Sequence, residues 1–331
     1  MANGKNLMQY KIKKISGDAS FREFYKIEKN FKSTILVKAN KDKFKNLIVY
    51  AAVNELLIKN KINAPKLSQE YFSSNMMEIG NLGNYSFLEY IKNKKNKLDD
   101  YKKLIKLIIR LQKIKFKKNI RFKNNKIKIS RHNLSELHKE SDLFFDWYLK
   151  NNGKKKEFKK NKNIIKKELN DLYKNLYFQE KCFVHRDFHA SNIMVKNKRF
   201  GLIDSQDAIN GNLLYDVASL IDDVRIKLPR KLKSSLFNYY LSKTNKIKNN
   251  KEKLFAKNDF DILSVQRNLK ILGIFVRLYK RDNKSIYLKY LPYTWKLLEL
   301  RLKNPIFINL RYLLNKAINK KNRKKINFND N

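Results

Sequence analysis

Hydrophobic positions in the first eighty residues alternate between short extended runs and one helical stripe. Residues 10–40 are typical of strands, since apolar side chains gather near Phe24 and again at Ile35, Leu36 and Val37. From 44 to 60 the apolar residues recur three and four positions apart, which predicts an amphipathic helix. A further strand pair is expected near residues 68–79. This order predicts a small segment of mixed strands and helix.

From about residue 83 the apolar spacing becomes helical. A first stripe is formed by Leu104, Leu107, Ile108, Leu111 and Ile114. Further helices are predicted over residues 136–149, 164–178, 214–224, 232–242, 259–280 and 290–301. Three short apolar runs between residues 182 and 203 interrupt the helices and are typical of buried strands.

The polar residues around those strands carry the most specific pattern in the chain. Residues 185–192 are HRDFHASN, so four residues separate Asp187 from Asn192, and Asp204 follows Asn192 by twelve. This is the layout of a kinase-like catalytic loop followed by a metal-binding loop. In such sites one Asp takes or positions the proton of the attacking hydroxyl, while an Asn and a second Asp hold Mg²⁺ against the phosphates of ATP. A lone HRD occurs by chance, but this spacing between predicted strands disfavours that alternative.

The motif and the element order together predict an α+β fold of the protein-kinase-like, bilobal kind. We expect a small mixed N-lobe with an antiparallel sheet over residues 1–82, and a larger, mainly helical C-lobe over 83–316. The basic segment 317–331 is expected to be a disordered tail. The chemistry predicted is phosphoryl transfer from ATP, with Asp187 as the catalytic residue.

The charge of the chain modifies this prediction little. Lysine and arginine number 76 against 30 acidic residues, for a formal net charge of +46. Such a balance is typical of nucleic-acid or membrane-surface binding. The lysines are spread almost everywhere, however, which favours compositional bias over a specific nucleic-acid site. The basic clusters at 154–167 and 317–325 are where the alternative would apply.

Cysteine usage and hydropathy point to a cytoplasmic protein. Cys182 is the single cysteine, so no disulfide framework is possible within the chain. The N-terminus lacks the apolar core of a signal peptide, and no stretch approaches a membrane span. We expect a monomer that acts on a small molecule.

Two groups of residues are candidates for contact with the nucleotide phosphates. The first comprises Gly17, Asp18, Ala19 and Ser20, which lie between two predicted strands and are small enough for backbone amides to approach phosphate oxygens. An ordinary turn is the alternative, because the three-glycine pattern of protein kinases is absent.

The second group is a possible ion pair between Lys38 and Glu55. Lys38 ends a predicted strand, from which it could reach the α- and β-phosphates, and Glu55 lies on the following helix, where it could steady the lysine. A chance lysine is the alternative in a chain this rich in lysine.

Three more residues near the motif are candidates for supporting roles. Asp216 opens a predicted helix, where it is either a helix-start residue or a buried carboxylate that supports the catalytic-loop backbone. His185 is expected to brace the loop. His189 either lines the substrate pocket or packs in the core.

The chain resembles the aminoglycoside-phosphotransferase superfamily, and within it the bacterial anomeric kinases of N-acetylmuramate and N-acetylglucosamine. The segments that carry the resemblance are GDASFREFYKI (17–27), DLFFDWYL (142–149), VHRDFHASNIMV (184–195), IDSQDAINGNLLYDVASLIDD (203–223) and LKILGIFVRLYKRDNKSIYLKYLP (269–292).

The resemblance implies roles for individual residues. Asp187 would be the base, and Asn192 and Asp204 the Mg²⁺ ligands. The loop at 17–22 would cover the phosphates. Segment 78–83, which includes Glu78 and Gly80, would pair with adenine through its backbone. Gln206 and Asp207 would lie near the sugar.

Three hypotheses remain for the acceptor and the activity. The first is a kinase of the anomeric hydroxyl of an N-acetylated amino sugar in cell-wall recycling. The second is a kinase of another hydroxyl compound, such as an aminoglycoside or choline, although a cationic acceptor needs acidic residues that are scarce here. The third is a non-catalytic nucleotide- or nucleic-acid-binding protein, against which the intact metal-ligand positions argue.

Overall fold

The structure is a computed structural model that describes residues 11–15, 22–29, 32–40, 44–115 and 119–323. Its contacts divide the chain into two compact units. Unit 1 comprises Met1–Lys94, Phe116–Ile129 and Ser191–Ala208, and unit 2 comprises Lys95–Lys115, Ser130–Ala190 and Ile209–Asn331. This division differs from a single boundary after residue 82, because two later segments return to unit 1.

Unit 1 is built on a five-stranded antiparallel sheet in the order β1-β2-β3-β5-β4. Its strands are β1 (Lys11–Ile15), β2 (Glu23–Lys29), β3 (Lys32–Lys38), β4 (Leu67–Tyr71) and β5 (Met76–Gly80), and a 3-10 turn, η2 (Phe72–Ser74), joins the last two. One face packs on helix α1 (Phe44–Lys59), as the alternating and helical patterns predict. The core between them includes Val37, Met77 and Leu47.

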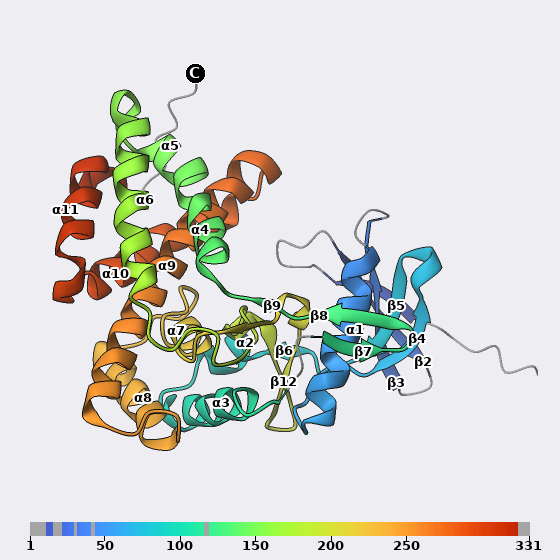
Figure 1. Ribbon diagram of the computed structural model, residues 1–331. Helices are drawn as coiled ribbons and strands as arrows, with labels where there is room; N and C mark the ends of the chain where they lie inside the picture. The colour runs from blue at the N-terminus through green and yellow to red at the C-terminus, as the bar shows by residue number, and fades with distance from the viewer. Residues whose placement is uncertain (1–10, 16–21, 30–31, 41–43, 116–118, 324–331) are drawn as a thin grey trace, which may run out of the picture. The chain divides into compact units, whose positions relative to one another are not determined.

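A hairpin that the sequence analysis did not anticipate extends this core. It consists of β7 (Asn119–Phe122) and β8 (Asn125–Lys128) and lies beside α1 (Figure 1). Phe122 is buried in the same core, and Ile120 and Ile127 pack against it. The short strands give only one or two apolar positions each, too few for a clear period-2 signal.

The strands that follow the catalytic motif also belong to unit 1. Strand β11 (Ile193–Lys196) pairs with β12 (Arg199–Leu202) on one side and with β6 (Tyr85–Ser86) on the other. Helix α2 (Phe87–Lys92) follows β6 directly and begins with a capping box, in which Ser86 and Glu89 satisfy each other's backbone amides.

Unit 2 is mainly helical. Its helices are α3 (Leu98–Leu111), α4 (Leu134–Leu143), the π-helix η3 (Phe144–Leu149), α5 (Lys150–Asn152), α6 (Phe158–Lys174), α7 (Tyr215–Ile221), α8 (Arg230–Lys243), α9 (Asn250–Asp282), α10 (Leu291–Arg301) and α11 (Ile308–Ala317). Short 3-10 helices are η4 (Lys155–Glu157), η7 (Ser285–Tyr290), η8 (Pro305–Phe307) and η9 (Lys320–Arg323). Within the described part of the chain, no helix is both long and apolar enough to cross a membrane.

Helix α9 is the central helix of unit 2. It has 33 residues, about 50 Å at 1.5 Å per residue, and packs against α4, η3, α7 and α10 (Figure 1). Asn249 caps its start by accepting from the amide of Glu252, and Asn283 ends it in the left-handed conformation. The helix starts nine residues before the predicted 259, because its first turns are rich in lysine and asparagine rather than apolar residues.

A small sheet holds the start of the catalytic motif in unit 2. Strand β10 (Cys182–Val184) pairs antiparallel with β13 (Ile209–Gly211), and β13 pairs parallel with β9 (Ser130–Arg131). All three residues of β10 are buried, as the apolar run predicts.

The segment for which we expected a disordered tail is folded where the structure describes it. Residues 317–323 continue unit 2, and Arg323 is buried there, only 4% exposed. Its guanidinium lies 4.7 Å from the ring of Trp295 and donates to Glu299 at 2.7 Å. These contacts give the segment the apolar and ionic partners that a free tail would lack.

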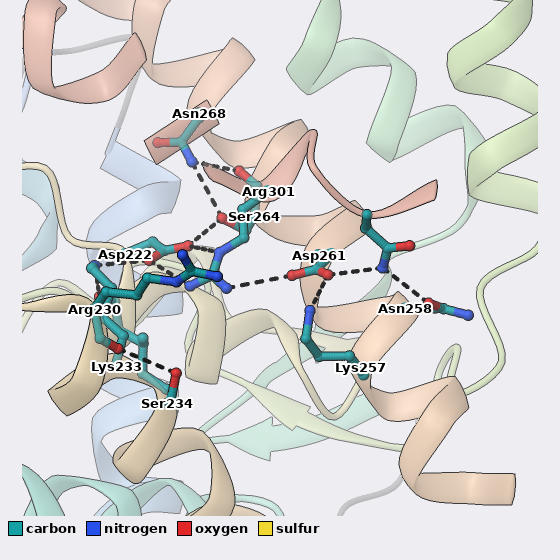
Figure 2. A network of polar contacts seen from close by, with 12 residues as sticks. Asp222, Arg230, Lys233, Ser234, Lys257, Asn258, Asp261, Ser264, Asn268 and Arg301 are labelled. Atoms are coloured by element: carbon teal, nitrogen blue, oxygen red, sulfur yellow. Dashed lines mark hydrogen bonds and ion pairs between the residues drawn. The ribbon is translucent and has the colours of Figure 1, made fainter. Parts of the chain in front are cut away.

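A buried ionic network joins α7, α8, α9 and α10. Asp222 accepts from Lys233 at 2.8 Å, from Arg301 at 2.7 and 3.0 Å and from Ser264 (Figure 2). Asp261 extends the network through Arg301 and Lys257. Burial alone would raise the pKa of Asp222, but the charges of Lys233 and Arg301 outweigh it and hold that pKa well below its usual range.

Candidate active site

A cleft of about 610 Å³ opens on the sheet of unit 1. One wall is the inner face of the sheet, where Ile35 and Ile79 lie opposite each other on β3 and β5. The segment Gly80–Asn84 forms a second side, and Asn192 and Asp204 line a third. An apolar wall with polar groups at its edge is typical of a nucleotide or cofactor site.

Asn192 and Asp204 are brought together by the strand pair β11–β12. The amide of Ile203 donates to the carbonyl of Asn192 at 3.0 Å, so the residue before Asp204 is tied to Asn192. Asp204 adopts a left-handed backbone conformation with φ of 65°, and its amide donates to the hydroxyl of Tyr50 at 3.2 Å. A non-glycine residue in this conformation costs about 1–3 kcal/mol and is typical of functional sites.

The oxygens of Asn192 and Asp204 fit a magnesium ion bound jointly with phosphates. Mg²⁺ prefers hard oxygen ligands and commonly takes one or two protein groups, the rest being waters and substrate oxygens. Within the described residues no group of three or more His, Cys, Asp or Glu side chains could hold a metal alone. Two oxygen donors are a number that proteins commonly contribute when waters and substrate oxygens complete the shell of Mg²⁺.

Arg22, the last residue of the expected phosphate-covering loop at 17–22, is a site residue that the sequence analysis did not single out. It is only 5% exposed, ion-pairs with Asp204 and donates to Gln206 Oε1 at 2.9 Å. Its guanidinium lies 5.7 Å from the ring of Phe24 and 5.3 Å from that of Tyr50. A buried cation is thus fixed at the carboxylate expected to hold the metal.

Helix α1 supports Asp204 with two polar side chains on its buried face. Burial is the main cause that raises the pKa of Tyr50 to about 12, so its hydroxyl stays neutral. Asn54 accepts from Ser205, which follows Asp204, at 2.6 Å. Both residues fall on the apolar stripe that starts at Leu47, at i+3 and i+7, so periodicity could have marked them as inward-facing polar groups.

The expected pair of Lys38 and Glu55 does not form. Glu55 pairs with Lys59 on the exposed side of α1. Lys38 is exposed, and its charge lowers the pKa of Glu23 by less than the charge of Lys14 does. The reason is strand alternation: Ile35 faces the cleft, so Val37 faces inward and Lys38 faces away.

The two residues expected in the adenine-binding segment, Glu78 and Gly80, differ in whether they line the cleft. Glu78 lies opposite Leu36, on the far face of the sheet, and accepts from Thr34. Gly80 does line the cleft. The four residues of the expected phosphate loop, Gly17, Asp18, Ala19 and Ser20, lie outside the described residues.

In unit 2, the loop that carries Asp187 is held at both ends by buried carboxylates. Asp216 accepts from the amides of His185 at 2.7 Å and Arg186 at 3.0 Å, which is the supporting contact expected of it. Asp223, which the sequence analysis did not single out, accepts from the amide of Ala190 at 2.9 Å. The backbone on either side of Asp187 is thereby fixed.

A third carboxylate anchors the side chains around this loop. Glu140 accepts from Arg186 at 2.7 Å, Lys270 at 3.0 Å and Tyr215 at 2.9 Å. Burial alone would raise the pKa of Glu140, but Lys270 and its other cationic neighbours hold it well below its usual range. Arg186 has a φ of 75°, in the left-handed region. Its amide donates to Asp216 and its side chain donates to Glu140, and these two contacts hold it in this conformation.

The remaining candidates are distributed over the two units. His185 is fully buried, and its ring packs edge-on to Phe188, consistent with a bracing role. His189 lines a second cavity together with Asp187. Gln206 lies in the 3-10 turn η6 (Ser205–Asp207), where it is buried and donates to the exposed Asp207 at 2.9 Å.

Comparison with known proteins adds to this geometry. Residues 11–249 match the phosphotransferase enzyme family. The chain belongs to this family. Members transfer phosphoryl groups. In this phosphotransferase, Asp187 lies on the loop whose backbone amides donate to Asp216 and Asp223.

Curated relatives cover most of the phosphotransferase. An N-acetylmuramate/N-acetylglucosamine kinase of Neisseria meningitidis is 27% identical over 284 residues, which is 84% of this chain and 81% of the relative. The kinase with the same name from Pseudomonas aeruginosa is 25% identical over 288 residues, with 86% and 81% covered. The enzyme is therefore an ATP-dependent kinase that phosphorylates a hydroxyl group of a small molecule.

Solved structures show the fold of the phosphotransferase. An ADP-bound aminoglycoside phosphotransferase has a TM-score of 0.58 and 14% identity, with 92% of this chain and 96% of that chain covered. An ethanolamine kinase of Plasmodium vivax has a TM-score of 0.61 and 14% identity, with 91% and 84% covered. The predicted kinase-like α+β fold is confirmed.

Proposed function

We propose that this phosphotransferase transfers the γ-phosphate of ATP to the anomeric hydroxyl of N-acetylmuramate or N-acetylglucosamine, as a step in cell-wall recycling. The observation that carries the proposal is the pair of relatives named for these two sugars, each matched over more than four fifths of both chains. The intact motif of Asp187, Asn192 and Asp204 supports it, because phosphoryl transfer needs all three functions.

ATP is proposed to bind in the cleft of unit 1. The adenine would lie between the apolar face of the sheet and the segment Gly80–Asn84, whose backbone offers hydrogen-bonding groups. Asn192 and Asp204 would hold Mg²⁺, which when bound neutralises charge on the transferred phosphoryl oxygens. Arg22, rather than Lys38, is proposed as the buried cation near the phosphates.

Asp187 is proposed to accept the proton of the attacking hydroxyl. An anomeric hydroxyl is more acidic than the other hydroxyls of a sugar, so a carboxylate can assist its deprotonation without a strongly raised pKa. The hydrogen bonds from His185, Arg186 and Ala190 to Asp216 and Asp223 fix the loop, which reduces the reorganisation needed to reach the reactive geometry.

The test is turnover of ATP with each sugar, with phosphorus NMR of the product. We expect a sugar 1-phosphate and loss of the reducing end. Asp187→Asn is expected to lower kcat by about 10²–10⁴-fold, the usual range for a lost general base, with little change in nucleotide affinity. A 6-phosphate, or turnover of another alcohol but neither sugar, would refute the substrate assignment while leaving the kinase chemistry intact.

A further inference from the structure

Unit 2 contains a small cavity that includes the proposed base. Its volume is about 80 Å³, room for a few non-hydrogen atoms by the space that one water needs. Asp187 and His189 line it from the loop after β10, and a face of α9 forms another wall. The wall residues with charged or apolar side chains are Asp222, Asp223, Val224, Arg225, Arg267, Lys270, Ile271, Ile274 and Phe275.

Two cations of α9 are fixed in this wall. Arg267 is only 7% exposed, donates to the carbonyl of Arg186 at 3.0 Å and lies 4.8 Å from the ring of Tyr215. The Lys270 ammonium, 14% exposed, lies 3.0 Å from Glu140. Burial lowers the pKa of Lys270, but Glu140 more than reverses this and raises it above its usual value. Both side chains therefore carry charge within the protein, where Glu140 is the ion-pair partner of Lys270 and acids that include Asp187 stabilise the charge of Arg267.

Two of the acids in the wall are already bound to other groups. Asp222 accepts from Lys233 and Arg301, which lie outside the cavity wall (Figure 2). Asp223 accepts from the amide of Ala190, and its other oxygen accepts from the amide of Arg225 at 2.9 Å. Their negative charge is directed to those partners.

Three cations contribute a positive potential at His189. Desolvation is the main cause that lowers its pKa, and the charges of Arg225, Arg267 and Lys270 lower it further, well below its usual value. The ring is therefore neutral at pH 7. A cationic group would meet the same repulsion at this place, whereas an anion would be attracted.

We propose that this cavity binds a carboxylate of the acceptor, with Arg267 and Lys270 as its main partners, and that the preferred acceptor is an acidic sugar. The inference rests on the proposed function and goes further, because N-acetylmuramate carries a lactyl carboxylate and N-acetylglucosamine does not. Arginine presents a planar fork that matches a carboxylate, and Lys270 adds a point charge beside it.

The apolar residues of the wall agree with this ligand. Ile271, Ile274 and Phe275 lie on α9 next to the two cations, so a small group with a charged end and a methyl group would meet both kinds of surface. The lactyl ether has this composition. An acceptor that carries ammonium groups would instead be rejected by Arg225, Arg267 and Lys270.

The test compares N-acetylmuramate with N-acetylglucosamine in the wild type, Arg267→Gln and Lys270→Gln. We expect the wild type to prefer N-acetylmuramate by at least about tenfold in kcat/KM. Each variant should lower the ratio of kcat/KM for N-acetylmuramate to kcat/KM for N-acetylglucosamine by about 10–100-fold, the range for a hydrogen bond to a charged group. Arg277→Gln, the same change on α9 at a residue outside the cavity wall, should leave both values unchanged.

Each contrary outcome overturns the proposal. Equal losses on both sugars, a loss of the same size in Arg277→Gln, or a wild type without preference would show that these cations only maintain the fold. Arg267→Lys keeps the charge without the fork, so it should retain part of the preference if Arg267→Gln proves unstable. A thermal scan of each variant identifies folding defects.

A further arm separates this inference from the proposed function. If neither sugar is phosphorylated, the proposed function fails, and calorimetry with glucuronate and glucose tests the cavity directly. Tighter binding of glucuronate that Arg267→Gln abolishes would support a carboxylate site. Equal binding of the two sugars would overturn it.

Discussion

Arg22 shows how one buried side chain changes the expected set of nucleotide contacts. Its ion pair with Asp204 and its hydrogen bond to Gln206 fix a cation at the edge of the cleft, whereas Lys38 lies exposed on the other face of the sheet. The phosphates of a nucleotide are stabilised by positive charge that is already in position. The structure thus favours the arginine over the lysine for this role.

Exchanging these two cations for glutamine tests that difference. Arg22→Gln is expected to lower kcat/KM for ATP by about 10–100-fold, since a charge-assisted contact would be lost. Lys38→Gln, the matched control on the same sheet, should change it less than about twofold. Steady-state kinetics at saturating acceptor measure kcat/KM for ATP in both variants. A larger loss in Lys38→Gln than in Arg22→Gln would restore Lys38 as the phosphate contact.

At the residue scale, the sequence identifies candidate site residues where their spacing forms a motif. Asp187, Asn192 and Asp204 are candidates from one motif and the strands around it, and Asp216 is a candidate from the start of a predicted helix. Asp223 and Glu140 could not be found in this way, because they meet the loop through the tertiary fold, at sequence distances of 33 and 46 residues. The prediction that Lys38 contacts the phosphates failed because a strand has two faces and the sequence alone did not identify the inner one.

Among the elements, α9 depends on a close approach to the junction of α4 and the π-helix η3. A Cβ placed on Gly273 would lie 2.2 Å from the carbonyl carbon and oxygen of Leu143 and 2.6 Å from the amide nitrogen of Phe144. Backbone atoms cannot yield as a flexible side chain can. The crossing of these helices therefore requires glycine at position 273.

Gly273→Ala is accordingly expected to destabilise the protein. In an exposed helix this change stabilises by up to about 1 kcal/mol, but here overpacking should cost about 1–3 kcal/mol or more. Thermal or urea unfolding measures the effect. Gly80→Ala is the control, since its Cβ would meet nothing closer than 3.7 Å, and an unchanged midpoint for Gly273→Ala would contradict the packing argument.

The ionic network around Asp222, which joins four helices, is expected to make the free energy of unfolding depend on pH in the acid range. Asp222→Asn is expected to cost about 3–5 kcal/mol at pH 7, because Lys233 and Arg301 would lose their buried counter-charge (Figure 2). The pKa of Asp222 is depressed in the folded state, so its contribution is present above the unfolded value of about 4 and disappears as pH falls below it.

Urea unfolding between pH 7 and pH 3 measures this contribution. The gap in unfolding free energy between wild type and Asp222→Asn should narrow as the pH decreases below about 4. Glu28→Gln removes an exposed partner of Lys26 and should leave the midpoint unchanged at either pH. A gap that stays constant would show that the charge of Asp222 is not what stabilises the network.

Long elements with strong periodicity were predicted, and short or locally polar ones were not. The helices α1, α3, α8 and α10 lie within six residues of their predicted positions or stripes. The hairpin β7–β8, helix α2 and helix α11 had no prediction, because their apolar residues are few or pack against segments distant in sequence. The π-helix η3 follows α4 without a break in the apolar pattern, so the sequence does not distinguish it.

At the scale of the whole molecule, the formal charge of +46 sets the behaviour toward polyanions. Lysines occur on most elements of both units, which favours a diffuse positive field over one binding face. Such a field attracts nucleic acid without reading its sequence. Solubility and non-specific association, rather than recognition, are the expected consequences.

Binding to unrelated DNA fragments is therefore expected to be weak and to vanish as salt rises. Counterion release predicts a steep linear fall of the logarithm of the binding constant with the logarithm of salt concentration. Fluorescence anisotropy at several salt concentrations measures this slope. Tight binding of one sequence at physiological salt would instead favour a genuine nucleic-acid function.

The two carboxylates that hold the catalytic loop also determine how that loop fluctuates. Asp216 lies in α7 and Asp223 lies two residues after its end, so both attachment points of the loop belong to one short, buried stretch of chain. The amides of His185, Arg186 and Ala190 can then exchange with solvent only when that stretch opens. The loop amides are therefore expected to exchange at the rate at which α7 opens, although the polar sequence of the loop is typical of a surface turn.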